Sequence, residues 1–119
     1  MLLRRSFCFA ALLLPALCGG DVVVRTYAGS GTSASVDGPG STAAFKDFRG
    51  LTLLRDGRLV VADTTANLVR IVETDSYVRT VAGESQGTAD GIETAAEFDT
   101  VSGVAALAST DDPVFVTDQ

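Results

Sequence analysis

The sequence repeats itself once, and this duplication limits the folds that the chain can adopt. Five blocks recur in the same order at offsets of 53–55 positions: 24–29 (VRTYAG) as 78–83 (VRTVAG), 37–38 (DG) as 90–91 (DG), 43–45 (AAF) as 96–98 (AEF), 50–51 (GL) as 103–104 (GV), and 59–63 (LVVAD) as 114–118 (VFVTD). A fixed period of this length predicts stacked repeats, each too small to bury its apolar face alone.

Within the repeats the pattern is that of short antiparallel strands. β-Branched and aromatic residues gather at 22–27, 51–54, 58–62, 68–73, 77–82, 103–107 and 114–116. Turn residues separate them, and Asp56-Gly57 predicts a hairpin turn in which both residues take positive φ. The segment 51–82 therefore reads as a four-stranded antiparallel meander, and half of a second one follows. Four-stranded units repeated at this period are typical of β-propeller blades, whereas a solenoid, the alternative, usually has one or two strands per repeat.

The first twenty residues have the pattern of a secretory signal peptide. Arg4 and Arg5 precede an apolar run at 7–17, and small residues follow from Cys18. The run is shorter than the roughly 20 residues of a membrane span, which argues against the alternatives of an anchor or a core helix. We expect cleavage between Cys18 and Asp21, and a secreted protein. Because both cysteines lie in this segment, the mature chain has no disulfide framework.

The chain is acidic, with a net charge of -6 and no histidine. Without Arg4 and Arg5 the balance is seven basic against 15 acidic residues. Such a surface repels phosphate backbones, so nucleic-acid binding is disfavoured. The charge would suit cations or basic partners, and equally it keeps an exported protein soluble.

The repeated residues resemble the NHL repeat over positions 24–118. The resemblance rests on Gly50-Leu51, on 57–64 (GRLVVADT), on Asn67, on 69–71 (VRI), on 78–83 (VRTVAG), on Asp90-Gly91 and on Phe98. Two positions depart from that family's pattern: Leu68 replaces a histidine, and Thr117 replaces an alanine. The resemblance implies an all-β, incomplete β-propeller with four-stranded antiparallel blades.

Together with the signal-peptide pattern, the resemblance implies a chain of four parts. Residues 1–20 are the signal peptide, 21–28 an isolated outer strand of a neighbouring or closing blade, 29–82 a first blade with its inter-blade loop, and 83–119 a partial second blade. Closing a ring takes about four to eight blades. We therefore expect the sequence to be a fragment or a truncated gene model of a longer protein.

Most of the repeated residues have a structural explanation. Asp63 is expected to close its turn by accepting nearby backbone N–H groups, and Asn67 to take the left-handed conformation. Gly29, Gly31, Gly83 and Gly87 would allow positive φ, and the two phenylalanines would fill apolar space between blades. The structural repeat positions are Gly29, Phe45, Gly50, Asp63, Asn67, Gly83, Phe98, Gly103 and Asp118.

Candidate binding residues lie in the two long loops, 28–49 and 83–102. Strand alternation places both loops at one end of the sheet, together with the turn at 63–67, and loops on a rigid scaffold commonly bind ligands. The candidates are Asp37, Asp47, Asp63, Asp90 and Glu93. We predict no catalytic residues, no metal site and no cofactor. Ca²⁺ is a weak alternative through Asp37 and Asp90, because a dedicated site needs several oxygens in a close cluster.

Three functions remain open. The first is a secreted binding or scaffold module for an unknown protein or small molecule. The second is part of a propeller enzyme, similar to amidating lyases or lactonases, whose metal ligands lie on further blades, since a chain without histidine is a poor zinc site. The third is self-association through open blade edges. RNA binding, known for some cytoplasmic relatives, conflicts with the export signal and the acidic loops.

Overall fold

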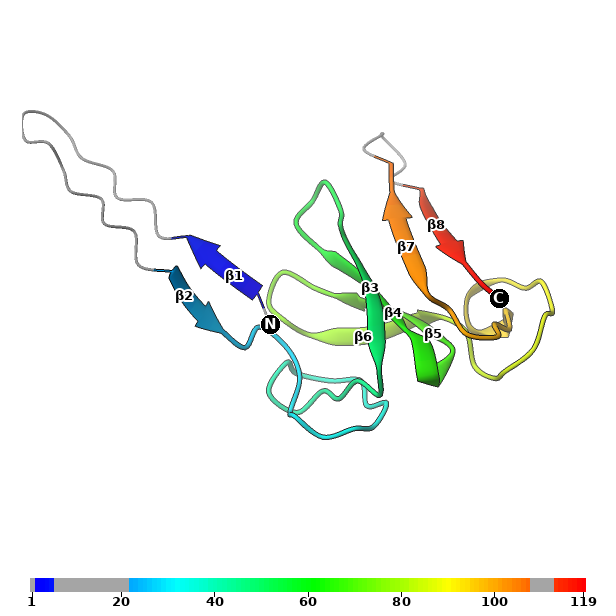
Figure 1. Cartoon of the computed structure of the whole chain (residues 1–119), viewed down its shortest axis with the longest axis horizontal. Helices are drawn as coiled ribbons and strands as arrows, with labels where there is room; N and C mark the ends of the chain where they lie inside the picture. Colours follow the sequence, from blue (N-terminus) through cyan, green and yellow to red (C-terminus); the bar gives the residue numbers. More distant parts are fainter. Residues whose placement is uncertain (1, 6–21, 108–112) are drawn as a thin grey trace, which may run out of the picture.

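The chain folds into antiparallel β-sheets, as the alternation of short apolar strands predicts. A computed structural model describes residues 2–5, 22–107 and 113–119, and in these residues it has two two-stranded sheets and one four-stranded sheet (Figure 1). Two short 3₁₀ turns, η1 (Thr64–Ala66) and η2 (Glu93–Ala95), are the helical segments of this part. The strands are β1 (Leu2–Arg5), β2 (Val22–Arg25), β3 (Phe48–Leu53), β4 (Leu59–Asp63), β5 (Leu68–Val72), β6 (Val78–Ala82), β7 (Gly103–Ala106) and β8 (Val114–Thr117). None of the described helical segments has the length and apolar character to cross a membrane.

The four-stranded sheet has the predicted meander order, β3-β4-β5-β6. The hairpin at Asp56-Gly57 is present, but the prediction that both residues take positive φ is wrong: of the two, only Gly57 does, at +93°. The N–H of Gly57 donates to the carbonyl of Leu54 (3.1 Å), and the N–H of Leu54 donates to Arg58 (2.8 Å). Residues 55–57 thus lie between the hydrogen-bonded residues Leu54 and Arg58, and one left-handed glycine is enough to reverse the chain in a loop of this length.

The N-terminal strand is paired rather than isolated. The expected strand at 22–27 is β2, which pairs antiparallel with β1, with Arg25 opposite Leu2 and Val22 opposite Arg5. The apolar run at 7–17 and both cysteines of the expected signal peptide lie outside the described residues. In the full chain β1 is therefore the partner of β2, since a strand with free backbone groups pairs with an extended segment within reach. That residues 21–28 are an outer strand of another blade stays a prediction.

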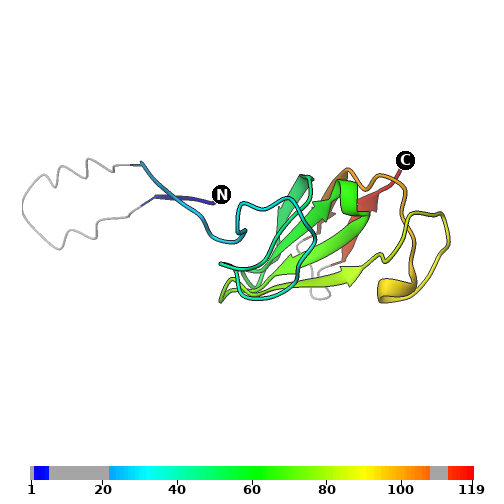
Figure 2. The same ribbon diagram turned by 90° about the horizontal axis from the view of Figure 1, so that it is seen from below.

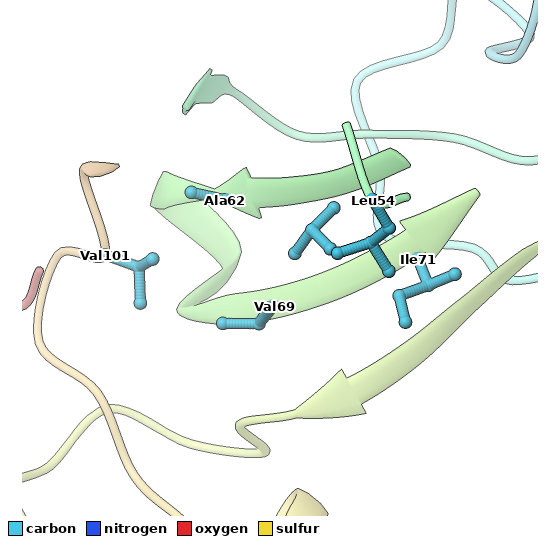
Figure 3. Packing of buried hydrophobic residues seen from close by; sticks show 6 residues of the cluster. Leu54, Ala62, Val69, Ile71 and Val101 are labelled. Carbon is cyan, nitrogen blue, oxygen red and sulfur yellow. The ribbon is translucent and has the colours of Figure 1, made fainter. Parts of the chain in front are cut away.

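One face of the four-stranded sheet packs against β7 and β8. The β7–β8 pair lies beside β3, as two perpendicular views show (Figures 1 and 2). The buried residues of this interface are Leu54, Val60, Ala62, Val69, Ile71 and Val101 (Figure 3). A Cβ atom on Gly50 would lie 3.0 Å from the backbone nitrogen of Val104, so glycine lets β3 and β7 approach closely.

The loop at 28–47 covers the opposite face of the sheet over β4, β5 and β6. Ala43 from this loop packs with Val61, Val72 and Val78, and Phe45 lies partly buried against them. Residues 60–63 of β4 and 69–72 of β5 are consequently buried on both faces of the sheet. This double burial explains why both strands are nearly continuous apolar runs instead of alternating ones.

The two repeats share local structure at equivalent positions. A parallel bridge joins Ser33 to Phe45 in the first repeat, and another joins Gln86 to Phe98 in the second. Likewise, the backbone N–H of Lys46 donates to Asp63 (3.1 Å), and that of Asp99 to Asp118 (2.7 Å). The duplication seen in the sequence is thus a duplication of hydrogen-bonding pattern.

Candidate functional site

The most concentrated polar site in the described residues is built around Arg70. This arginine stands in the middle of β5 on the face covered by the loop at 28–47, and its side chain is fully buried. Its Nη2 donates to Asp37 Oδ1 (2.6 Å) and to the carbonyl of Val36 (2.7 Å). Its Nη1 donates to the carbonyl of Ala44 (2.5 Å) and to Asp63 Oδ2 (3.4 Å). One guanidinium group thus ties the loop to β4 and β5.

An aromatic ring completes the enclosure of this guanidinium. Arg70 Cζ lies 4.7 Å from the ring centroid of Phe45, a distance typical of a cation–π contact. Phe45 in turn meets Phe48 edge-to-face, with ring centroids 5.6 Å apart. The charge is therefore surrounded by two carboxylates, two carbonyls and an aromatic face, which is what a buried cation requires.

Asp63 is the buried carboxylate of the network, with no exposed surface. It was expected to close its own turn, but η1 has no side-chain cap. Its carboxylate instead accepts the backbone N–H groups of Lys46 and Asp47 (both 3.1 Å) and the hydroxyl of Ser35 (3.2 Å). The expectation that it binds backbone N–H groups is confirmed, while the expected partners are wrong, because the preceding loop passes closer to Asp63 than its own turn does.

Asn67 and the glycines follow the predicted backbone pattern with one exception. Asn67 is left-handed (φ 57°, ψ 40°), as predicted, and its side-chain oxygen also accepts the N–H of Thr100 (2.9 Å). Gly29, Gly31 and Gly83 have positive φ, and Gly87 does not. A Cβ on Gly87 would overlap the present position of the Glu97 carboxylate, which is the flexible end of that side chain.

Asp37 is the half-exposed carboxylate of the network, and it links two strands. It pairs with Arg70 of β5 and accepts the backbone N–H of Thr80 (2.8 Å) and its hydroxyl (3.1 Å) on β6. Partial burial raises the pKa of Asp37, but the hydrogen bonds from Thr80 and Arg70, with the charge of Arg70, outweigh it and hold the pKa below 3.8. The group is therefore ionised at neutral pH.

The predicted candidates divide into two groups in space. Asp37 and Asp63 meet at Arg70, and Asp47 lies next to them, exposed and 3.4 Å from Arg49 Nη2. Asp90 and Glu93 are exposed on the other long loop, where Glu93 begins η2. The structure thus brings three of the five candidates together and leaves two apart.

Both long loops contact the end of the sheet at the turn 63–67, where Asp47 binds Asp63 and Thr100 binds Asn67, but the first loop also extends to the opposite end. The first loop runs along the sheet to the far turn, where the Tyr27 hydroxyl donates to the Thr74 carbonyl (2.9 Å) and Gly38 pairs with Val78. The second loop stays near Asn67, which binds Thr100. The first loop runs across the face of the sheet because some of its side chains are buried there. Strand alternation alone does not predict this course.

The arrangement around Arg70 is a clamp and has no features of a reaction centre. Asp63 is sealed from solvent, and its oxygens and those of Asp37 are already hydrogen-bonded. Across the described residues, no group of three or more His, Cys, Asp or Glu side chains is placed to hold a metal ion. The two carboxylates considered for Ca²⁺, Asp37 and Asp90, lie on different loops.

Arg70 itself was missed as a site residue from the sequence. It appears there only as part of the apolar segment 69–71. A signal was available, since a charged residue between two apolar β-branched ones in a central strand must be paired if it is buried.

Comparison with known proteins adds a fold relationship. No protein-family model and no curated protein matches the sequence. Among solved structures, the chain is similar to a Bacteroides thetaiotaomicron protein that is provisionally described as a phosphatase, with a TM-score of 0.68 and 22% identity. The match covers 77% of this chain and 23% of that one, so the chain spans about a quarter of its structural relative. At this identity the relationship concerns the fold alone.

Proposed function

We propose that the chain is a secreted module of an NHL-type β-propeller and acts by binding or scaffolding. The observation that carries this proposal is the repeated packing unit: equivalent hydrogen bonds recur at Asp63 and Asp118, and the sheet of one repeat stacks face-to-face on that of the next. Face-to-face stacking of four-stranded units is how propeller blades build a continuous core. Loops carried by a rigid scaffold commonly hold binding residues.

The location is proposed from the sequence pattern at residues 1–20. Removal of this segment would also remove β1, the partner of β2 in the full chain. β2 would then be free to pair with the edge of another blade. N-terminal sequencing of exported protein should begin between residues 19 and 22, and a mature protein that retains Met1 would contradict export by cleavage.

The architecture can be tested by joining residues 29–82 in tandem, in chains of four, six and eight copies. A propeller predicts that one copy number gives a compact, cooperatively unfolding monomer, expected near six. A solenoid predicts instead that the radius of gyration and the unfolding enthalpy rise steadily with copy number. Small-angle scattering and calorimetry on the three chains distinguish the two.

The remaining alternative is a propeller enzyme whose metal ligands lie outside these 119 residues. Binding function predicts that the purified chain holds no stoichiometric zinc or calcium and hydrolyses neither lactones nor phosphate esters. A metal bound one-to-one by a longer form of the protein, together with hydrolysis of lactones or phosphate esters, would favour the enzyme instead.

A further inference from the structure

Among the residues that the structure describes, an apolar surface is exposed on each of the two repeats. The front face, on β3 and β4, consists of the exposed Phe48, Leu51 and Leu53 and the half-buried Leu59, with the buried Val61 beneath them; it borders an apolar hollow that Tyr27 and Phe45 also line. Its most exposed members are Phe48 and Leu51, both 53% exposed, and Leu53, 64% exposed. Exposed apolar clusters of this kind mark surfaces that bind a partner.

The back face lies on the outer side of β7 and β8. Ala105 and Phe115 are opposite each other in the strand pair, and Leu107 follows on the same side. Phe115 is 60% exposed and Leu107 is 57% exposed. The other side of the same two strands, which carries Val104 and Val116, packs against the four-stranded sheet.

The internal repeat relates the back face to a surface that is already buried. The first-repeat equivalents of Ala105, Leu107 and Phe115 are Thr52, Leu54 and Val60. Leu54 and Val60 are 4% and 1% exposed, in the cluster covered by β7 and β8. The hydroxyl of Thr52 accepts the backbone N–H of Ala106 (3.3 Å).

The same relation holds for the front face. The second-repeat equivalents of its residues are Val101, Val104, Ala106, Val114 and Val116. All five belong to the cluster that packs on the first repeat, where Val101 is fully buried. Within one chain, the first-repeat surface that is equivalent to the back face therefore already packs against the second-repeat surface that is equivalent to the front face.

We propose that the partner of the front face is a second copy of this chain, which docks its back face there head-to-tail. The contact between copies repeats the contact within one copy, with Phe115 and Leu107 of one chain against Phe48 and Leu51 of the next. Such an interface is heterologous, so it extends to rings or to open filaments. It involves sheet faces, and it differs in this from pairing through free strand edges.

The test uses two substitutions in the full chain, Phe48→Asp on the front face and Phe115→Asp on the back face. Light scattering after size exclusion should show that the unmodified chain forms assemblies larger than a dimer and that each variant alone is a monomer. An equimolar mixture should form a one-to-one heterodimer, at twice the monomer mass. In the mixture, the intact back face of Phe48→Asp docks on the intact front face of Phe115→Asp, and neither end can extend further.

Ile92→Asp is the matched control. Ile92 is 84% exposed and lies on neither face, so this variant should assemble like the unmodified chain. Circular dichroism checks the fold, and Leu51→Asp replaces Phe48→Asp if the latter unfolds. A monomeric unmodified chain overturns the proposal, as does assembly that neither face variant reduces. Loss of assembly in Phe48→Asp alone, without complementation, would indicate two-fold pairing of front faces and also overturns it. These outcomes do not depend on whether tandem repeats close into a ring.

Discussion

Asp37 in the first repeat and Asp90 in the second occupy equivalent positions, and their surroundings differ. Asp37 is held by Arg70 and Thr80, on the third and fourth strands of its sheet. Asp90 is exposed, and the described residues of the second repeat include no equivalent of the third and fourth strands that hold Asp37. The same local sequence is thus a clamped loop in one repeat and a solvated one in the other. Whether a carboxylate in such a loop is held by hydrogen bonds and an ion pair depends more on the strands that the loop contacts than on the loop's own residues.

The largest effect is expected from removing the cation of the clamp. Arg70→Met leaves the Asp63 carboxylate buried without its counter-charge, which typically costs about 3–5 kcal/mol. Arg79→Met is the control, because its pair with Glu73 is partly exposed and is expected to be worth no more than about 1 kcal/mol. Urea denaturation at pH 7 measures both. Equal losses would mean that the network does not stabilise the first repeat.

A pair of glycines tests whether the two loops begin under the same constraint. Gly29 and Gly83 both have positive φ, so alanine at either should cost about 1–3 kcal/mol in backbone strain. A Cβ on Gly83 would also collide with the Asn67 carbonyl oxygen, whereas one on Gly29 would lie 3.8 Å from Phe45. We expect Gly83→Ala to destabilise the protein more than Gly29→Ala. The reverse order in thermal denaturation would show that the second loop relaxes easily.

Phe45 and Phe98 differ in their aromatic contacts, since Phe45 lies against the Arg70 guanidinium and also meets Phe48 edge-to-face. Both are partly buried. Leucine keeps most of the apolar volume and removes the aromatic face. Phe45→Leu should therefore cost about 1 kcal/mol more than Phe98→Leu, the value of a partly shielded cation–π contact. If the two variants are equally stable in urea, the contact between the guanidinium and the ring does not add to the free energy of unfolding.

The smallest effect is the pH dependence of the clamp. Because the pKa of Asp37 is lowered in the folded state, its contribution is present above 3.8 and is lost as the pH falls through the lowered value. Asp37→Asn should cost about 1 kcal/mol at pH 7, since the carboxylate is partly solvated and its pairing is screened. The difference from the unmodified chain should shrink as the pH is lowered below 3.8. Asp90→Asn should be neutral at every pH, and a matching loss there would remove the distinction between the repeats.

Strands and turns were predictable because their signals are local. All seven predicted strands are present, with boundaries that shift by at most three residues, as for β3, which begins at Phe48 instead of Leu51. The left-handed Asn67 follows from its side chain. By contrast, the pairing of β2 with β1 and the course of the loop at 28–47 depend on distant segments. The partners of Asp63 are 16 and 17 residues earlier in the chain, and no turn rule reaches that far.

The sequence by itself determined the duplication, the all-β class, the meander and the glycine and asparagine positions, since each depends on residue type, period and local backbone preference. Only the tertiary structure decided which carboxylates become buried, which strand supplies the guanidinium between them, and which apolar faces stay open. These depend on which surfaces the fold brings together, because the cost of burying a charge or exposing a phenylalanine is set by its neighbours in space.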